Sequence, residues 1–264
     1  GEHGIPDRKA PVKVESDGSA SFRIPANTPI SIQPLDSKDR ALQLMRSWLV
    51  GMPGEKVSCN GCHEDPNTAP PRVTPIASKR PPTDIEPWYG PARPFSFRHE
   101  VLPVLQKHCA GCHNGKPRAD KRIIPDLAGK IKEPSNMPEK AARFHQTEYY
   151  RDVSYMALQP FVRRPGSESD YHMLKPMEYH ASTSELMQML EKGHNNVKLS
   201  EEDYQRLVTW IDLNVPHRGS WRPPVWRGQE QDKRRLQLAK LYASVDTDPE
   251  QEFARIEAAA AKRP

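Results

Sequence analysis

Two short motifs hold every cysteine of the chain and constrain its fold more than any other feature. Each reads Cys-x-x-Cys-His, in SCNGCHEDPN at residues 58–67 and in HCAGCHNGKP at residues 108–117. At this spacing two thiols can add across the vinyl groups of one haem while the adjacent imidazole reaches the iron. The sequence therefore predicts two covalently bound c-type haems with a fold built around them.

Other uses of paired cysteines remain open. Four thiolates can bind one zinc ion, the thiols can pair as disulfides, and a Cys-x-x-Cys pair can serve as a thioredoxin-like redox motif. The histidine directly after each pair favours haem over these three. The six residues of the two predicted sites are Cys59, Cys62 and His63 at the first motif, and Cys109, Cys112 and His113 at the second.

The second axial ligand of each iron has to come from elsewhere in the chain. His194 follows Gly193 in the turn KGHNNVKLS, at the end of a predicted helix, and we expect it to be the distal ligand of the second haem. A histidine at this position could instead cap the helix C-terminus. His180 precedes the same helix and is the next candidate, for either haem. Further candidates are His3, His99, His108, His145, His172, His217, Met52, Met137, Met173 and Met177.

Proline content and weak apolar content shape the expected fold. Hydrophobic residues make up 36% of the 264 residues, and the 28 prolines are about twice the usual share. We therefore expect long loops around a modest core that haem helps to fill. In GSASFRIPANTPISIQPLD, apolar and polar residues alternate at 22–24 and again at 30–32. This stretch predicts a β-hairpin, the remnant of a small β-sandwich, and hence an α+β fold.

The remainder is predicted to be mostly helical and rich in loops. The segment 95–113 forms a helix that leads into the second motif. TSELMQMLEKG has a Thr/Ser cap and ends at Gly193, and the helix in LSEEDYQRLVTWIDLN opens with Ser200 and Asp203 at capping-box spacing. We expect three parts: an arm and β module at 1–54, a dihaem cytochrome c domain at 55–227, and a helical tail at 228–264.

Charge and hydropathy argue against two classes of function. The net charge is +5, but haem propionates would offset it, and no basic stripe with interleaved aromatic residues predicts nucleic-acid binding. No apolar run is long enough to predict a transmembrane segment. The first residues lack an apolar signal core, so we expect a mature chain or a piece of a longer protein. Haem attachment predicts a periplasmic or other extracytoplasmic location.

Two stretches of the chain resemble one family. The stretch GSASFRIPANTPISIQPLD, with LQLMRSWLVGMPGEKVSCNGCHE after it, resembles the middle region of the hydrazine synthase alpha subunit and its relatives in planctomycete-type bacteria. VLPVLQKHCAGCHNG and the segment 171–221 resemble the C-terminal region of the same proteins. The resemblance implies an exported multidomain protein with two c-type haems. It also implies two histidine ligands for the second haem, with His194 at the position of the distal one.

The family's first haem differs from this sequence at one position. In the family that haem is catalytic, a tyrosine four residues after the motif histidine ligates it, and the motif histidine binds zinc. Asn67 stands at the position of that tyrosine here. The resemblance therefore supports haem content and fold more than hydrazine chemistry, and we expect His63 to ligate its own haem.

Three functions are consistent with these features. The first is an exported dihaem cytochrome that relays electrons between redox partner proteins or to further domains or subunits. The second is a haem enzyme, similar to the hydrazine synthase alpha subunit, that acts on a small nitrogen or peroxide species at the first haem. The third is a docking module in which the haems are secondary. The sequence favours the electron relay.

Overall fold

The computed structural model describes a mostly helical and irregular chain. The described residues are 9–43, 45, 48–60, 73–90, 93–117, 124–131, 152–166, 169, 175–219, 228–244, 246, 248, 251 and 255. Every regular element within them is a helix. In chain order these are η1 (Ile76–Lys79), η2 (Phe97–Val101), α1 (Leu102–His108), α4 (Val153–Leu158), η4 (Gln159–Phe161), η5 (Ala181–Thr183), α5 (Glu185–Lys192), α6 (Glu201–Asp212) and α7 (Gly228–Ala243).

The predicted β-hairpin, and with it the α+β class, is wrong. Within the described residues there is no strand, only isolated bridges. Phe22 pairs with Thr83 and Ile30 pairs with Leu49, so the two alternating stretches do not pair with each other. Prolines at 25, 29 and 34 interrupt this segment. Because proline has no N–H to donate to a ladder, alternation alone could not produce a hairpin here.

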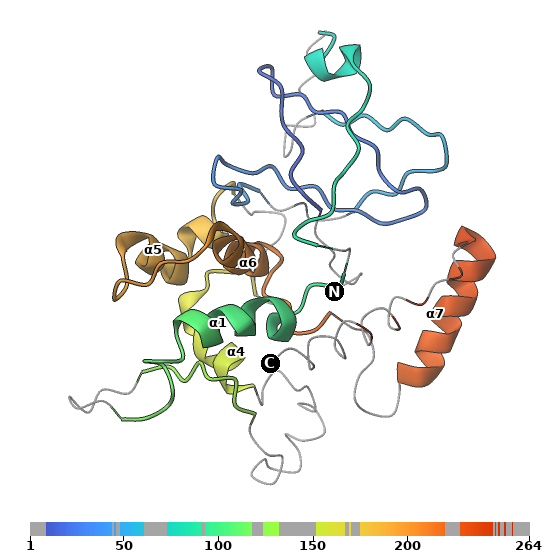
Figure 1. Ribbon diagram of the computed structural model, residues 1–264. Helices are drawn as coiled ribbons and strands as arrows, with labels where there is room; N and C mark the ends of the chain where they lie inside the picture. Colours follow the sequence, from blue (N-terminus) through green and yellow to red (C-terminus); the bar gives the residue numbers. More distant parts are fainter. Residues whose placement is uncertain are drawn as a thin grey trace.

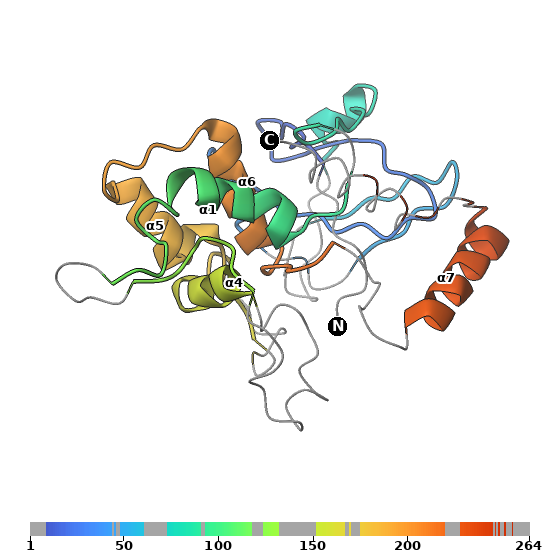
Figure 2. The ribbon, with the colours of Figure 1, turned by 60° about the horizontal axis from the view of Figure 1, so that its bottom comes forward.

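Four helices form one group that contains the core. In Figures 1 and 2, α1, α4, α5 and α6 lie together, whereas α7 stands apart from them in both views. The π-helical turn η2 runs directly into α1 and contacts α6, and η5 contacts both α5 and α6. The second Cys-x-x-Cys-His motif begins where α1 ends, so this helix group positions it.

Helix α6 is the central element of the core. Its Ser200 hydroxyl accepts the backbone N–H of Asp203 at 3.1 Å, which confirms the predicted N-cap. Every residue of this helix from 207 to 212 is buried, polar Thr209 and Asp212 included. Trp210 is fully buried and packs on Phe97, with their ring centroids 5.3 Å apart.

A segment of the N-terminal part, residues 33–42, is tied to the helix group through Asp212. The Asp212 carboxylate accepts the backbone N–H of Ala41 and that of Ala181, each at 2.8 Å. The Asp212 carbonyl also accepts the side-chain amide of Gln33 at 2.9 Å. One buried carboxylate thus joins three segments that are distant in sequence. The predicted division of the chain at 54/55 stays a prediction.

Helix α7 occupies the start of the predicted helical tail. Leu241 and Tyr242, near its end, are 69% and 78% exposed. Among the helices that the structure describes, none has the length and apolar character needed to cross a membrane.

Candidate functional site

The second motif forms a tight turn at the C-terminal end of α1. The N–H of Cys109 donates to the Leu105 carbonyl at 2.8 Å and ends the helix. The N–H groups of Cys112 and His113 then both donate to the Cys109 carbonyl, at 3.1 and 2.8 Å. The motif thus turns back on itself directly after α1.

The two thiols of this motif lie in different surroundings. Cys109 is half-buried and packs against the hydrophobic core, whereas Cys112 is exposed. Burial raises the pKa of the Cys109 thiol, and the neighbouring Cys112 raises it further. Cys59, Cys109 and Cys112 are free thiols. The disulfide alternative therefore finds no support at these three cysteines.

His113 is held in one tautomer by a backbone carbonyl. Its Nδ1 lies 3.0 Å from the carbonyl oxygen of Pro125. A carbonyl can only accept, so Nδ1 carries the proton, and in the neutral ring Nε2 then presents its lone pair. Histidines that bind metals usually donate their second ring N–H to a carbonyl or carboxylate in this way. The ring of His113 is thus prepared for ligation through Nε2.

A left-handed turn after α5 places His194 opposite His113. Gly193, Asn195 and Asn196 have φ values of +93°, +49° and +60°, and the N–H of Val197 closes the turn on the His194 carbonyl at 3.0 Å. Glycine and asparagine tolerate this region of backbone space best. The turn directs the His194 ring toward that of His113, with centroids 6.0 Å apart and planes inclined by 43°.

This separation matches two imidazoles that share one metal ion. A bond between a metal and an imidazole nitrogen is about 2 Å long, and the ring centroid lies about 1 Å beyond that nitrogen. Two imidazoles on opposite sides of one ion therefore have centroids ~6 Å apart. His194 Nε2 also lies 3.1 Å from the side-chain amide nitrogen of Asn195, an exposed contact that ligation through Nε2 would replace. The residues present fit a haem iron between the two rings.

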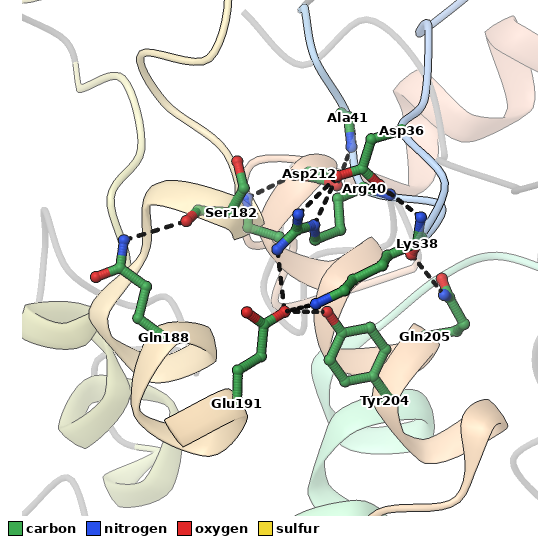
Figure 3. Close-up of polar contacts among 11 residues, drawn as sticks. Asp36, Lys38, Arg40, Ala41, Ser182, Gln188, Glu191, Tyr204, Gln205 and Asp212 are labelled. Carbon is green, nitrogen blue, oxygen red and sulfur yellow. Dashed lines mark hydrogen bonds and ion pairs between the residues drawn. The ribbon is translucent and has the colours of Figure 1, made fainter. Parts of the chain in front are cut away.

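An ionic cluster around Glu191 fixes the last turn of α5, from which His194 emerges. Glu191 Oε1 accepts hydrogen bonds from the Tyr204 hydroxyl at 2.7 Å and from Arg40 at 3.0 Å, with Lys38 Nζ at 3.4 Å (Figure 3). Arg40 also pairs with Asp36 at 2.7 Å. The cluster joins the N-terminal segment, α5 and α6, and so holds the end of α5 on both sides.

The charges of this cluster stabilise one another. Burial alone would raise the pKa of Glu191, but the Tyr204 hydroxyl and the Arg40 and Lys38 charges outweigh it, and the pKa is lowered. Burial raises the pKa of Tyr204, and the hydrogen bond to Glu191 raises it further. The cluster therefore keeps an ionised carboxylate and a protonated phenol at neutral pH.

The other predicted histidines in the described part have different partners. His180 is buried and begins η5, with its Nδ1 4.0 Å from Asp212. Its pKa is lowered by burial, which a hydrogen bond to the Leu42 carbonyl opposes. His108 donates from Nε2 to Asp203 at 2.8 Å. Of the two predicted distal ligands, it is His194 whose ring lies beside that of His113 in the second motif.

Most of the first motif lies outside the described residues. Cys59 is described and exposed, whereas Cys62, His63 and Asn67 fall outside the described part. Three other histidines and two of the loop methionines proposed as ligands also fall outside it: His3, His145, His172, Met137 and Met173. Within the described residues no group of three or more His, Cys, Asp or Glu side chains is arranged to hold a metal ion.

Sequence reasoning did not identify three residues that organise this site. Pro125 acts through its backbone carbonyl, which no side-chain pattern reveals. Glu191 looks like an ordinary helix-surface charge, and its cationic partners Lys38 and Arg40 lie some 150 positions away. Asp212 directly follows the apolar residues at the end of α6. An acidic residue next to such a run is the one sequence signal that its side chain is buried.

Comparisons with known proteins bear on the N-terminal part of the chain. Residues 9–64 match the family model of the hydrazine synthase alpha subunit middle domain. This match covers about a fifth of the chain and ends just after the first Cys-x-x-Cys-His motif. Searches of curated proteins and of solved structures found no match. Over residues 9–64 the chain is thus similar to the middle domain of hydrazine synthase alpha subunits.

Proposed function

We propose that the chain is an exported c-type cytochrome that binds two covalent haems and relays electrons between redox partner proteins. The observation that carries this proposal is the arrangement of His113 and His194, whose rings lie 6.0 Å apart. The hydrogen bond from His113 Nδ1 to the Pro125 carbonyl supports it, because it leaves Nε2 available for iron.

Each residue of the second site has a defined role in this proposal. Cys109 and Cys112 would hold the macrocycle through thioether bonds, and His113 and His194 would ligate its iron. When bound, the haem supplies an iron that cycles between the ferric and ferrous states. Two histidine ligands leave no open coordination position for a substrate, which favours electron transfer over catalysis at this site.

The surroundings of the second motif suit such a role. Cys109 packs on the core together with Leu190 and Leu199, which flank the His194 turn. These apolar groups exclude water from one side of the site. The exposed Cys112 marks the opposite side, where a redox partner can approach the edge of the macrocycle. Thioether attachment of haem takes place outside the cytoplasm, so the proposal includes a periplasmic or other extracytoplasmic location.

A second function is favoured by the family match. Residues 9–64 resemble a domain of an alpha subunit of hydrazine synthase and include the first motif up to His63. This supports a haem enzyme that acts on a small nitrogen or peroxide species at the first haem. Asn67 is not an axial ligand, so such an enzyme would differ from the family at the residue four positions after the motif histidine.

Haem content and spin state test both functions. The protein would be produced in a host with the c-type maturation machinery and purified in the ferric state. A pyridine haemochrome assay should give two haems per chain, and the spectrum should be low-spin throughout for the electron relay. A high-spin fraction that shifts when a small ligand is added would favour the enzyme. A chain without covalent haem would contradict both.

A further inference from the structure

We propose that Lys130 and Asp126 form a clamp that positions the Pro125 carbonyl on His113 and thereby sets the reduction potential of the second haem. The inference rests on the proposed function, because it concerns the fifth ligand of that haem. Lys130 and Asp126 are positioning residues here: they act through Pro125 and do not touch the iron.

The clamp closes a ring of contacts beside the motif histidine. Lys130 Nζ donates to Asp126 Oδ2 at 2.7 Å and to the carbonyl of Asn114 at 3.1 Å. Asn114 follows His113 in the chain, and Asp126 follows Pro125. The Lys130 ammonium group thus links the residue next to His113 with the residue next to Pro125. The N–H of Leu127 donates to the His113 carbonyl at 2.8 Å and adds a second link between the same two segments.

Gly115 shows how closely these two segments approach. Its φ is +74°, and a Cβ built on it would lie 2.4 Å from Asp126 Oδ2 and 2.9 Å from Lys130 Nζ. A Cβ at this position would therefore require the Asp126 carboxylate and the Lys130 ammonium group to shift. The clamp lies directly beside the backbone of Gly115, and a larger residue there would disturb the contact between Asp126 and Lys130.

The far end of the clamp segment is anchored to the helix group. The N–H of Gly129 donates to the Ser154 hydroxyl of α4 at 2.8 Å, and the Lys130 carbonyl accepts the N–H of Val153 at 2.9 Å. Ser154 is fully buried. The segment 125–130 is thus held by α4 at Gly129 and Lys130, and beside His113 it is held by the clamp and by the Leu127 N–H.

The strength of the hydrogen bond to His113 controls the donor strength of its imidazole. An imidazole that donates Nδ1–H to a well-placed carbonyl is a more basic ligand. A more basic ligand favours the ferric iron, so it lowers the reduction potential. Loss of the clamp should loosen the Pro125 carbonyl and raise the potential of the second haem. A purely structural role for Lys130 would lower stability without this change.

Spectroelectrochemical titration of the two-haem protein tests the clamp. Lys130→Met removes both contacts of the half-exposed ammonium group. Gly115→Ala displaces the Asp126 carboxylate. Lys130→Arg keeps the positive charge at position 130. Arg23→Met is the matched control, because it removes an exposed ion pair with Asp84 at 2.7 Å in another part of the chain. Haem content and circular dichroism are recorded for every variant to verify attachment and folding.

The clamp predicts a distinct pattern among these variants. One of the two midpoint potentials should rise in Lys130→Met and in Gly115→Ala, stay close to wild type in Lys130→Arg, and be unchanged in Arg23→Met. Unchanged potentials in Lys130→Met and Gly115→Ala, with two haems bound, would overturn the clamp and leave the proposed function standing. A wild-type protein without haem would overturn both the proposed function and the clamp.

Discussion

The imidazole rings of His113 and His194 face each other with their centroids 6.0 Å apart, although one follows α1 and the other follows α5. Two elements hold them in this position. The Pro125 carbonyl orients the first ring, and the left-handed turn after Gly193 directs the second. The two rings come from segments that are distant in sequence and are held together by separate contacts. This is the strongest structural support for the proposal that both rings bind one haem iron.

Removal of the His194 imidazole should open the sixth position of the second haem. We expect His194→Ala to retain two covalent haems, because the thioether bonds do not depend on this residue. The ferric spectrum should gain a high-spin component that added imidazole converts back to low spin. His108→Gln is the control, since His108 is bound to Asp203. A fully low-spin spectrum of His194→Ala would show that another residue is the sixth ligand.

Loss of the Asp212 carboxylate should destabilise the whole helix group. Asp212→Ala leaves the buried N–H groups of Ala41 and Ala181 without their acceptor. Each unsatisfied buried donor costs roughly 1–3 kcal/mol, so the free energy of unfolding should fall by about 2–6 kcal/mol. Asp212→Asn keeps an amide oxygen as acceptor and should cost less. Urea unfolding measures both.

The control for this experiment is Asp84→Ala, whose carboxylate is 74% exposed and forms an ion pair with Arg23. It should change the free energy of unfolding by less than about 1 kcal/mol. If Asp212→Ala cost no more than Asp84→Ala, the contacts between residues 33–42 and α6 would not stabilise the fold.

Stability should depend on pH through Asp203. Burial would raise its pKa, but hydrogen bonds from Lys107, His108 and Ser200 outweigh burial and lower the pKa from 3.8 to about 2. A carboxyl group with a lowered pKa stabilises the fold above its unfolded pKa, and this contribution is lost as the pH falls from about 4 to about 2. Its size is about 1–2 kcal/mol, because Lys107 is largely exposed and solvent screens the pair.

A comparison of wild type with Asp203→Asn separates the pH-dependent stability due to Asp203 from that due to the other carboxyl groups. Urea unfolding at pH 6 should show the variant to be less stable, and the difference should shrink as the pH approaches 2. Asp246→Asn, in an exposed ion pair with Lys240, should show a smaller difference at pH 6. A difference between wild type and Asp203→Asn that stayed constant with pH would refute the role of this ion pair.

Gly193 should be sensitive to substitution although the space around it is open. No atom lies within 4 Å of a Cβ built at this position, but its φ of +93° disfavours any L side chain. Gly193→Ala should lower the free energy of unfolding by about 1 kcal/mol. Gly166 also has open space, and its φ is not in the left-handed region, so Gly166→Ala should be nearly neutral. Equal effects of the two substitutions would exclude backbone strain as the cause.

The ends of α5 and α6 could be predicted from local signals, whereas the pairing of the N-terminal part could not. Ser200 caps α6 and Gly193 ends α5 as the sequence indicates, because caps depend on short-range hydrogen bonds. The alternation at Phe22 and Ile30 had the period of strands, but these residues pair with Thr83 and Leu49. A local alternation of polar and apolar residues does not indicate which distant segment a residue pairs with.

In the candidate site too, features that depend on local sequence could be predicted, and features that depend on tertiary contacts could not. The second motif and the position of His194 after a helix could be read from the sequence, because both rest on spacing and turn chemistry. The orientation of His113 depends on a carbonyl at Pro125, and the end of α5 depends on Arg40, which reaches Glu191 from the N-terminal part. Contacts of this kind arise only from tertiary packing.

The central claim is that His113 and His194 bind one iron from opposite sides. Electron paramagnetic resonance of the ferric Cys59→Ser/Cys62→Ser variant tests it most directly, because this variant can attach haem only at the second motif. The account predicts one covalent haem per chain with the low-spin signal of two histidine ligands. A high-spin signal, or the absence of covalent haem, would contradict it.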